Sequence, residues 1–128
     1  MMNGWRRSIR CYVSPADNNK IRDWYEGLSP QEKADADVFL TNMRKTQEWK
    51  MPAYRPRLHG GEGLGELRWR SEGKEHRLMG FFMGAYWYAV IGCTHKQGVY
   101  SPTDALNTAK RNKRQIERGE VRTEDYDL

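Results

Sequence analysis

Three arginines stand where two adjacent predicted strands would bring them together. A stretch of alternating residues places Leu67 and Trp69 on one side of a strand and Arg68 and Arg70 on the other. The following strand carries Arg77, which the same reasoning sends to the outward face. Their acidic neighbours, Glu66 and Glu75, would form only surface pairs worth less than about 1 kcal/mol each. The face is therefore either simply solvated or the receptor of an anion.

The alternation of side chains along the second strand decides which face of the sheet Arg77 is on. Leu78 and Phe82 are expected to fill the core, which sends Arg77 and Met79 outward. We therefore predict that Arg77 is exposed and that its replacement by alanine leaves the fold intact.

A second set of polar side chains follows the last predicted strand. His95 could act as a general base or acid, Lys96 as a phosphate clamp, and Tyr100 as a base-stacking ring or proton donor. The alternative is an ordinary surface loop in which these side chains cap local backbone.

A basic helix follows, from Ser101-Pro102 to about Arg118. Its candidate RNA-binding residues are Lys110, Arg111 and Arg114. The residues expected to pack on the sheet are Leu106, Ala109 and Ile116. A solvated helix face is the alternative for the basic side.

Other motifs lack the context that their chemistry requires. The glycines between Gly61 and Gly65 precede a strand and do not join a strand to a helix, so a pyrophosphate loop is not expected. His59, His76 and His95 have no spacing typical of zinc. We expect neither a metal nor a cofactor.

The elements that must position these residues follow from turn and capping signals. The predicted order is a strand at 10–13, helices at 15–25 and 30–45, a loop at 49–63, strands at 64–70, 75–83 and 86–94, and the final helix. The fold class is α+β: an antiparallel sheet with an N-terminal helical hairpin packed on one face, a C-terminal helix, and the other face open. Residues 1–118 are expected to form one domain and 119–128 a frayed acidic tail.

Composition agrees with one globular domain. The chain has 128 residues, 38% hydrophobic and 30% charged, with a net charge of +5. No run of residues is apolar and long enough to span a membrane, and the basic opening, residues 1–10, lacks an apolar signal segment. Two separated cysteines, Cys11 and Cys93, are expected to be reduced core residues, so we expect a cytoplasmic protein.

An ordered set of motifs resembles the RelE/HigB-type toxins of the RelE/ParE superfamily, closest to the phage-derived HigB-like branch. The resemblance covers roughly residues 37–118. It rests on Leu64-Gly65-Glu66-Leu67-Arg68, His76-Arg77-Leu78, His95-Lys96 and the helix beginning at Ser101-Pro102, preceded by Trp49-Lys50-Met51-Pro52 and Arg57-Leu58-His59-Gly60.

The resemblance implies a toxin that enters the ribosomal A site and cleaves translated mRNA. The ribose 2′-hydroxyl would attack the adjacent phosphate without a metal. Arg68 and Arg70 match basic residues of one strand, and Arg77 matches the arginine that stabilises the transition state. Lys96 or His95 falls near the basic residue after the last strand, and Tyr100 resembles the tyrosine that stacks on the base. His95 is our first choice for proton transfer because imidazole titrates near neutrality.

Two other functions remain open on the same scaffold. One is a ParE-like toxin that poisons gyrase, and the other is a phage protein that uses the fold for binding without cleavage. The dense arginine set argues against the gyrase reading. All three functions predict a helix-turn-helix antitoxin whose acidic or apolar segment masks the basic face; they predict no membrane partner.

Overall fold

The computed structural model describes residues 7–127; positions 1–6, which include part of the basic opening, and 128 lie outside the described residues. The elements in chain order are β1 (Ser8–Tyr12), α1 (Lys20–Glu26), α2 (Pro30–Lys45), β2 (Tyr54–Arg55), β3 (Gly65–Ser71), β4 (Lys74–Met83), β5 (Tyr86–Lys96), β6 (Val99–Ser101), α3 (Ala105–Glu117) and β7 (Thr123–Asp125). The α+β class and the three central strands are confirmed.

One mostly antiparallel sheet organises the chain. Its strand order is β2-β3-β4-β5-β1-β7, and β6 folds back onto β5. The exception to the antiparallel prediction is β1, which pairs in parallel with β5 through Ser8↔Tyr86 to Cys11↔Ala89. The two intervening helices and the meander bring the chain back beside its first strand, as a parallel pairing requires.

The two N-terminal helices begin at different kinds of cap. The predicted capping box of α2 is present: Ser29 and Glu32 each accept a hydrogen bond from the other's backbone N–H. The predicted start of α1 after Ser14 is wrong, because Asp17 adopts a φ of 69° and the chain turns there. Asn19 caps α1 instead, and its side chain accepts from the N–H groups of residues 21 and 22.

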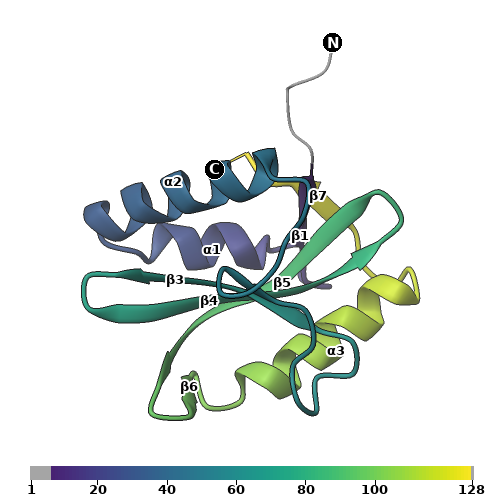
Figure 1. The fold of residues 1–128 in the computed structure, drawn as a ribbon. Helices are drawn as coiled ribbons and strands as arrows, with labels where there is room; N and C mark the ends of the chain where they lie inside the picture. The colour runs from purple at the N-terminus through teal and green to yellow at the C-terminus, as the bar shows by residue number, and fades with distance from the viewer. Residues whose placement is uncertain (1–6, 128) are drawn as a thin grey trace.

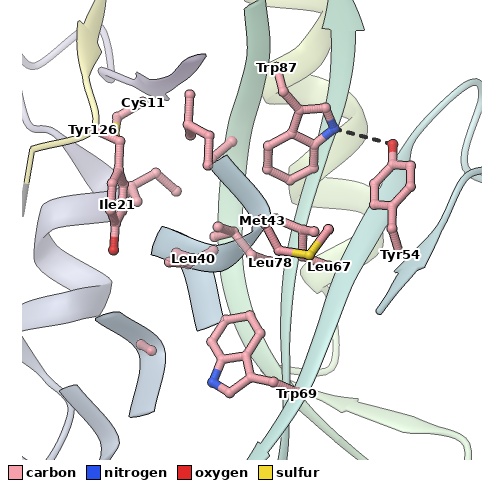
Figure 2. Packing of buried hydrophobic residues seen from close by; sticks show 13 residues of the cluster. Cys11, Ile21, Leu40, Met43, Tyr54, Leu67, Trp69, Leu78, Trp87 and Tyr126 are labelled. Carbon is pink, nitrogen blue, oxygen red and sulfur yellow. Dashed lines mark hydrogen bonds between the residues drawn. The ribbon is translucent and has the colours of Figure 1, made fainter. Parts of the chain in front are cut away.

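The helical hairpin covers one face of the sheet, above the strands in Figure 1. Buried side chains from α2, β3, β4 and β5 form the first core cluster there, including Leu40, Leu67, Leu78 and Trp87. Figure 2 shows these side chains together and the hydrogen bond from Trp87 Nε1 to the Tyr54 hydroxyl, 3.2 Å long.

The prediction that the opposite face of the sheet is open is wrong, because α3 crosses that face below the sheet in Figure 1. A second core cluster lies between the sheet and α3, and it contains Met79, Phe81, Val90 and Ala109. Met79 is therefore buried and not exposed. Phe82, expected in the core, is 44% exposed near the end of β4.

Two segments without predicted strands join the sheet at its edges. Within the expected loop, Tyr54 and Arg55 form β2 and pair with β3. Residues of the expected frayed tail form β7, which pairs antiparallel with β1. Tyr126 follows β7 and is buried in the first core cluster.

Both cysteines agree with their predicted state: Cys11 and Cys93 are buried free thiols. Between residues 7 and 127, no helix combines the length and the apolar character needed to cross a lipid bilayer.

Candidate functional site

The three predicted arginines gather on the face of the sheet that α3 partly covers. Arg68 on β3 lies directly opposite Arg77 on β4 in the strand register. Like charges in that position repel each other. The structure places the carboxylate of Glu66 beside both guanidinium groups, which relieves the repulsion.

Glu66 is the centre of this cluster and is only 1% exposed. Its Oε1 accepts a hydrogen bond from Arg68 Nε at 2.9 Å and lies 3.4 Å from Arg77 Nε. Its Oε2 accepts from the Tyr100 hydroxyl at 2.9 Å. Three strands, β3, β4 and β6, thus converge on one buried carboxylate. We call Glu66, Arg68, Arg77 and Tyr100 the buried cluster.

Arg77 is the clearest departure from the sequence analysis. It was expected in solvent, but its side chain is only 9% exposed. Besides Glu66, it contacts the Glu75 carboxylate, 3.7 Å from its terminal nitrogen, and donates to the carbonyl of His76 at 3.1 Å. The contact of its Nε with Glu66 lacks hydrogen-bond geometry and is an ion-pair contact only. An Arg77→Ala variant would therefore test folding and function together.

Arg70 is the accessible arginine of the set. Its side chain is 68% exposed, and its terminal nitrogen lies 2.6 Å from Glu75 Oε2. Arg70 and Glu75 are partners in the register of β3 and β4, and Glu75 is in turn opposite His95 of β5. This chain of pairings brings Arg70 and His95 to opposite sides of one acidic side chain.

A hollow of about 520 Å³ lies where these strands end. The side chains and turn residues that line it are Arg70, Gly73, Lys74, Glu75, Thr94, His95, Lys96 and Gln97. We call it the hairpin hollow, because it lies between the β3–β4 turn and the β5–β6 turn, both on the left in Figure 1. It brings together Arg70, His95 and Lys96 of the predicted site.

Tyr100 and His95 face each other across the β5–β6 pairing. They are register partners, and their rings meet edge to face with centroids 5.0 Å apart. Burial, reinforced by the Glu66 charge, raises the pKa of the Tyr100 phenol above its usual value. Tyr100 therefore stays protonated at neutral pH and donates to Glu66, and its ring packs against the imidazole of His95.

Cys93 lies close to the buried cluster but is not an active nucleophile. Burial, with a smaller contribution from the Glu66 charge, raises the pKa of its thiol to about 12. A thiol protonated at neutral pH is a poor nucleophile.

The three candidate RNA-binding residues lie along α3. Arg111 and Arg114 are exposed, and Lys110 is half-buried. Arg114 makes an ion pair with Glu62 at 3.3 Å, so a loop ahead of β3 partly neutralises this row. No described contact joins α3's basic residues to the arginines of β3 and β4.

The sequence indicates Glu66 and Glu75 as partners of the arginines, but it predicts only surface ion pairs. Glu66, Arg68 and Arg70 are two residues apart, so the sequence predicts that Glu66 lies on the same face of the strand as the arginines. It does not predict that Glu66 is buried. Part of its cover comes from Tyr100 of β6, and β6 lies in a segment where no strand was predicted. Lys74, at the mouth of the hairpin hollow, was likewise assigned to a turn.

Within the described range 7–127, no group of three or more histidine, cysteine, aspartate or glutamate side chains is arranged to hold a metal ion. Comparison with known proteins adds no relative: no family model, curated protein or solved structure matches this chain. The geometry of the buried cluster and the hairpin hollow is therefore the main basis for a functional conclusion.

Proposed function

We propose that this protein is the toxin of a toxin–antitoxin module and cleaves translated mRNA on the ribosome. The observation that carries the proposal is the assembly of Arg70, His95 and Lys96 around one hollow, backed by Arg68 on β3 and Arg77 on β4. The resemblance to RelE/HigB-type toxins supports it, because the motifs behind that resemblance contribute most of these residues.

The chemistry fits the attack of a ribose 2′-hydroxyl on the adjacent phosphate. Such a reaction needs a group that moves protons near neutral pH and cations that stabilise the charge on the phosphorane. His95 is suited to the first task because of its imidazole. Arg70 and Lys96 are suited to the second, since both line the hollow and Arg70 presents a planar fork to phosphate oxygens.

The buried cluster has a supporting role in this mechanism. Arg68 and Arg77 are engaged with Glu66, so they fix the strands and add positive potential without reaching solvent freely. Tyr100 is committed to Glu66 through its hydroxyl and positions His95 through its ring. Exposed cations on α3, Arg111 and Arg114, would extend the contact to the RNA backbone.

The test compares two arginines with matched ion pairs. Arg70→Ala removes a side chain paired to Glu75 at 2.6 Å. Arg122→Ala removes one paired to Glu124 at the same distance and also to Asp17 at 2.8 Å, away from the hollow, so it is the more demanding control for loss of ion pairs. In a cell-free translation reaction, primer extension should show cleavage slowed about 100-fold by Arg70→Ala, the effect typical of losing one group that stabilises the transition state. Arg122→Ala should cleave like the wild type. Equal cleavage by both variants would remove Arg70 from the mechanism.

A second function, RNA binding without cleavage, is favoured by one observation. Arg68, Arg70 and Arg77 all have carboxylate partners already, which leaves the cluster much less positive than three arginines alone. Intact transcripts after translation, together with RNA bound to the protein, would support this second function. Intact transcripts with broken DNA would instead support gyrase poisoning.

Either function requires a means of restraint in the cell that makes the protein. We propose a helix-turn-helix antitoxin in the cytoplasm whose acidic segment covers Arg70 and the hairpin hollow. Co-purification of the toxin with the product of the neighbouring reading frame, lost in Arg70→Glu, would support this partner. Unchanged co-purification would move the interface elsewhere.

A further inference from the structure

One acidic side chain projects into an otherwise cationic hollow. Among the described residues lining the hairpin hollow, Glu75 is the sole carboxylate; Arg70, Lys74, His95 and Lys96 are basic or protonable. Glu75 stands between the rim and the interior: its Oε2 lies 2.6 Å from exposed Arg70, and its Oε1 lies 3.7 Å from buried Arg77. Both oxygens thus face guanidinium groups, as two oxygens of a bound phosphate would.

The two carboxylates of this region differ in how firmly they are held. Glu66 is buried and contacts three partners on three strands. Glu75 is 38% exposed, and its closest partner, Arg70, is more exposed still. Exposed ion pairs contribute little to stability, so Glu75 can leave Arg70 at small cost. A phosphodiester can then take its place and bind the guanidinium through two oxygens.

We propose that Glu75 occupies the phosphate position in the free protein and must swing out before RNA binds. The inference deepens the proposed function and rests on it for the identity of the ligand, an RNA phosphodiester. The backbone of Glu75 is fixed between β3 and β5, so only its side chain needs to rotate. Glu75 is then an internal competitor that weakens RNA binding, and its removal strengthens binding.

The experiment measures the affinity for a single-stranded 2′-O-methyl RNA decamer labelled with fluorescein, which has no hydroxyl for cleavage. Glu75→Gln removes the competing charge and keeps the shape of the side chain. Glu72→Gln is the matched control, because Glu72 is an exposed residue of the same β3–β4 turn that does not line the hollow. Both variants change the net charge equally, so long-range attraction is the same in each.

We expect Kd to fall about three- to tenfold for Glu75→Gln, as expected for release from an exposed ion pair and a like charge. It should change less than twofold for Glu72→Gln. Equal shifts in the two variants would overturn the inference, as would unchanged or weaker binding by Glu75→Gln, or a decamer that binds none of the three proteins.

A measurement on the unaltered protein guards against a folding defect in the variants. In ¹³C NMR spectra, the side-chain carboxyl resonance of Glu75 should shift when the decamer saturates the protein, and that of buried Glu66 should stay in place. A Glu75 resonance that does not move would also overturn the inference.

Cleavage assays separate the two proposals. Tighter binding by Glu75→Gln without any cleavage of translated mRNA would keep Glu75 as the competitor and reject the nuclease function. Cleavage by the wild type without tighter binding by Glu75→Gln would do the reverse.

Discussion

At the scale of single residues, the buried carboxylate of Glu66 determines the state of its neighbours. Four titratable side chains surround Tyr100. They are Glu66 from β3, Arg77 from β4, and Cys93 and His95 from β5. Burial is the main reason that the pKa of Tyr100 lies above its ordinary value of 10, and the negative charge of Glu66 comes next. An adjacent anion makes the phenolate costly, so neutralising it favours ionisation.

Glu66→Gln should therefore lower the pKa of Tyr100, although burial keeps it above 10. Titration of the ¹³Cζ resonance of labelled tyrosine measures the shift directly. The same variant should lose about 3 kcal/mol in the free energy of unfolding in urea, because Arg77 stays buried with only the more distant Glu75 carboxylate as a countercharge. An unchanged Tyr100 titration would show that Glu66 does not act on the phenol.

Removing the hydroxyl of Tyr126 should raise the stability of the protein, whereas Glu66→Gln lowers it. The Tyr126 ring is 3% exposed in the first core cluster, and its hydroxyl is buried without a hydrogen-bond partner among the described residues. A buried polar group that lacks a partner costs free energy. Tyr126→Phe should stabilise the protein by about 1 kcal/mol, whereas Tyr126→Ala should destabilise it by about 3 kcal/mol through the cavity it leaves. Urea unfolding of both variants measures the pair; a loss of stability in Tyr126→Phe would reveal an unseen partner.

At the scale of elements, the N-terminus of α2 gives the fold an acid-sensitive contact. The backbone N–H of Ser29 hydrogen-bonds to the Glu32 carboxylate and is the largest cause that lowers the pKa of Glu32 below its ordinary 4.5. A carboxyl whose pKa is lowered by folding stabilises the protein above its unfolded pKa. That contribution is lost as the pH falls through the lowered value.

Glu32→Gln should make the free energy of unfolding depend less steeply on pH in the acidic range. Glutamine preserves the capping box without a charge to titrate, so stability below pH 4.5 should fall less steeply than in the wild type. Urea unfolding between pH 2.5 and 6 measures the slopes. Glu48→Gln, which changes an exposed carboxylate outside any cap, should follow the wild-type curve; identical curves for Glu32→Gln would contradict the linkage.

The elements that the sequence predicted well are those with local signals. Alternation over β3 and the capping box of α2 act within a few residues, so they survive in the folded chain. In contrast, β2 and β7 are short edge strands whose pairing partners lie more than ten residues away. Their formation depends on the finished sheet, and the acidic composition of β7 gave no strand signal.

The candidate site shows the same division. The period of two placed Arg68, Arg70 and Arg77 on one face, and the structure agrees. Exposure was predicted wrongly for Arg77, because burial on that face depends on α3 and on the return of β6 over β5. Local alternation reports which side a residue faces, but only the tertiary fold decides whether that side is covered.

At the scale of the whole molecule, two apolar clusters share one sheet. The first lies between the sheet and the helices α1 and α2, and the second lies between the sheet and α3. Strands β4 and β5 contribute to both. Tryptophans of the described region, Trp24, Trp49, Trp69 and Trp87, all belong to or pack on the first cluster. The fluorescence of these four tryptophans therefore reports on the helical-hairpin face, whereas α3 lies on the other side of the strands.

This arrangement predicts that a substitution that destabilises α3 also destabilises the first core cluster on the opposite face of the sheet. Ala109 is fully buried in the middle of α3, and Ala109→Gly should cost about 1 kcal/mol through helix propensity alone. Because the same strands support both clusters, the chain should unfold in one transition. The urea midpoint followed by tryptophan fluorescence should then shift as far as the midpoint followed by far-ultraviolet circular dichroism. A fluorescence midpoint that stays at the wild-type value would mean that α3 detaches first, and the second core cluster would then be uncovered without unfolding the sheet.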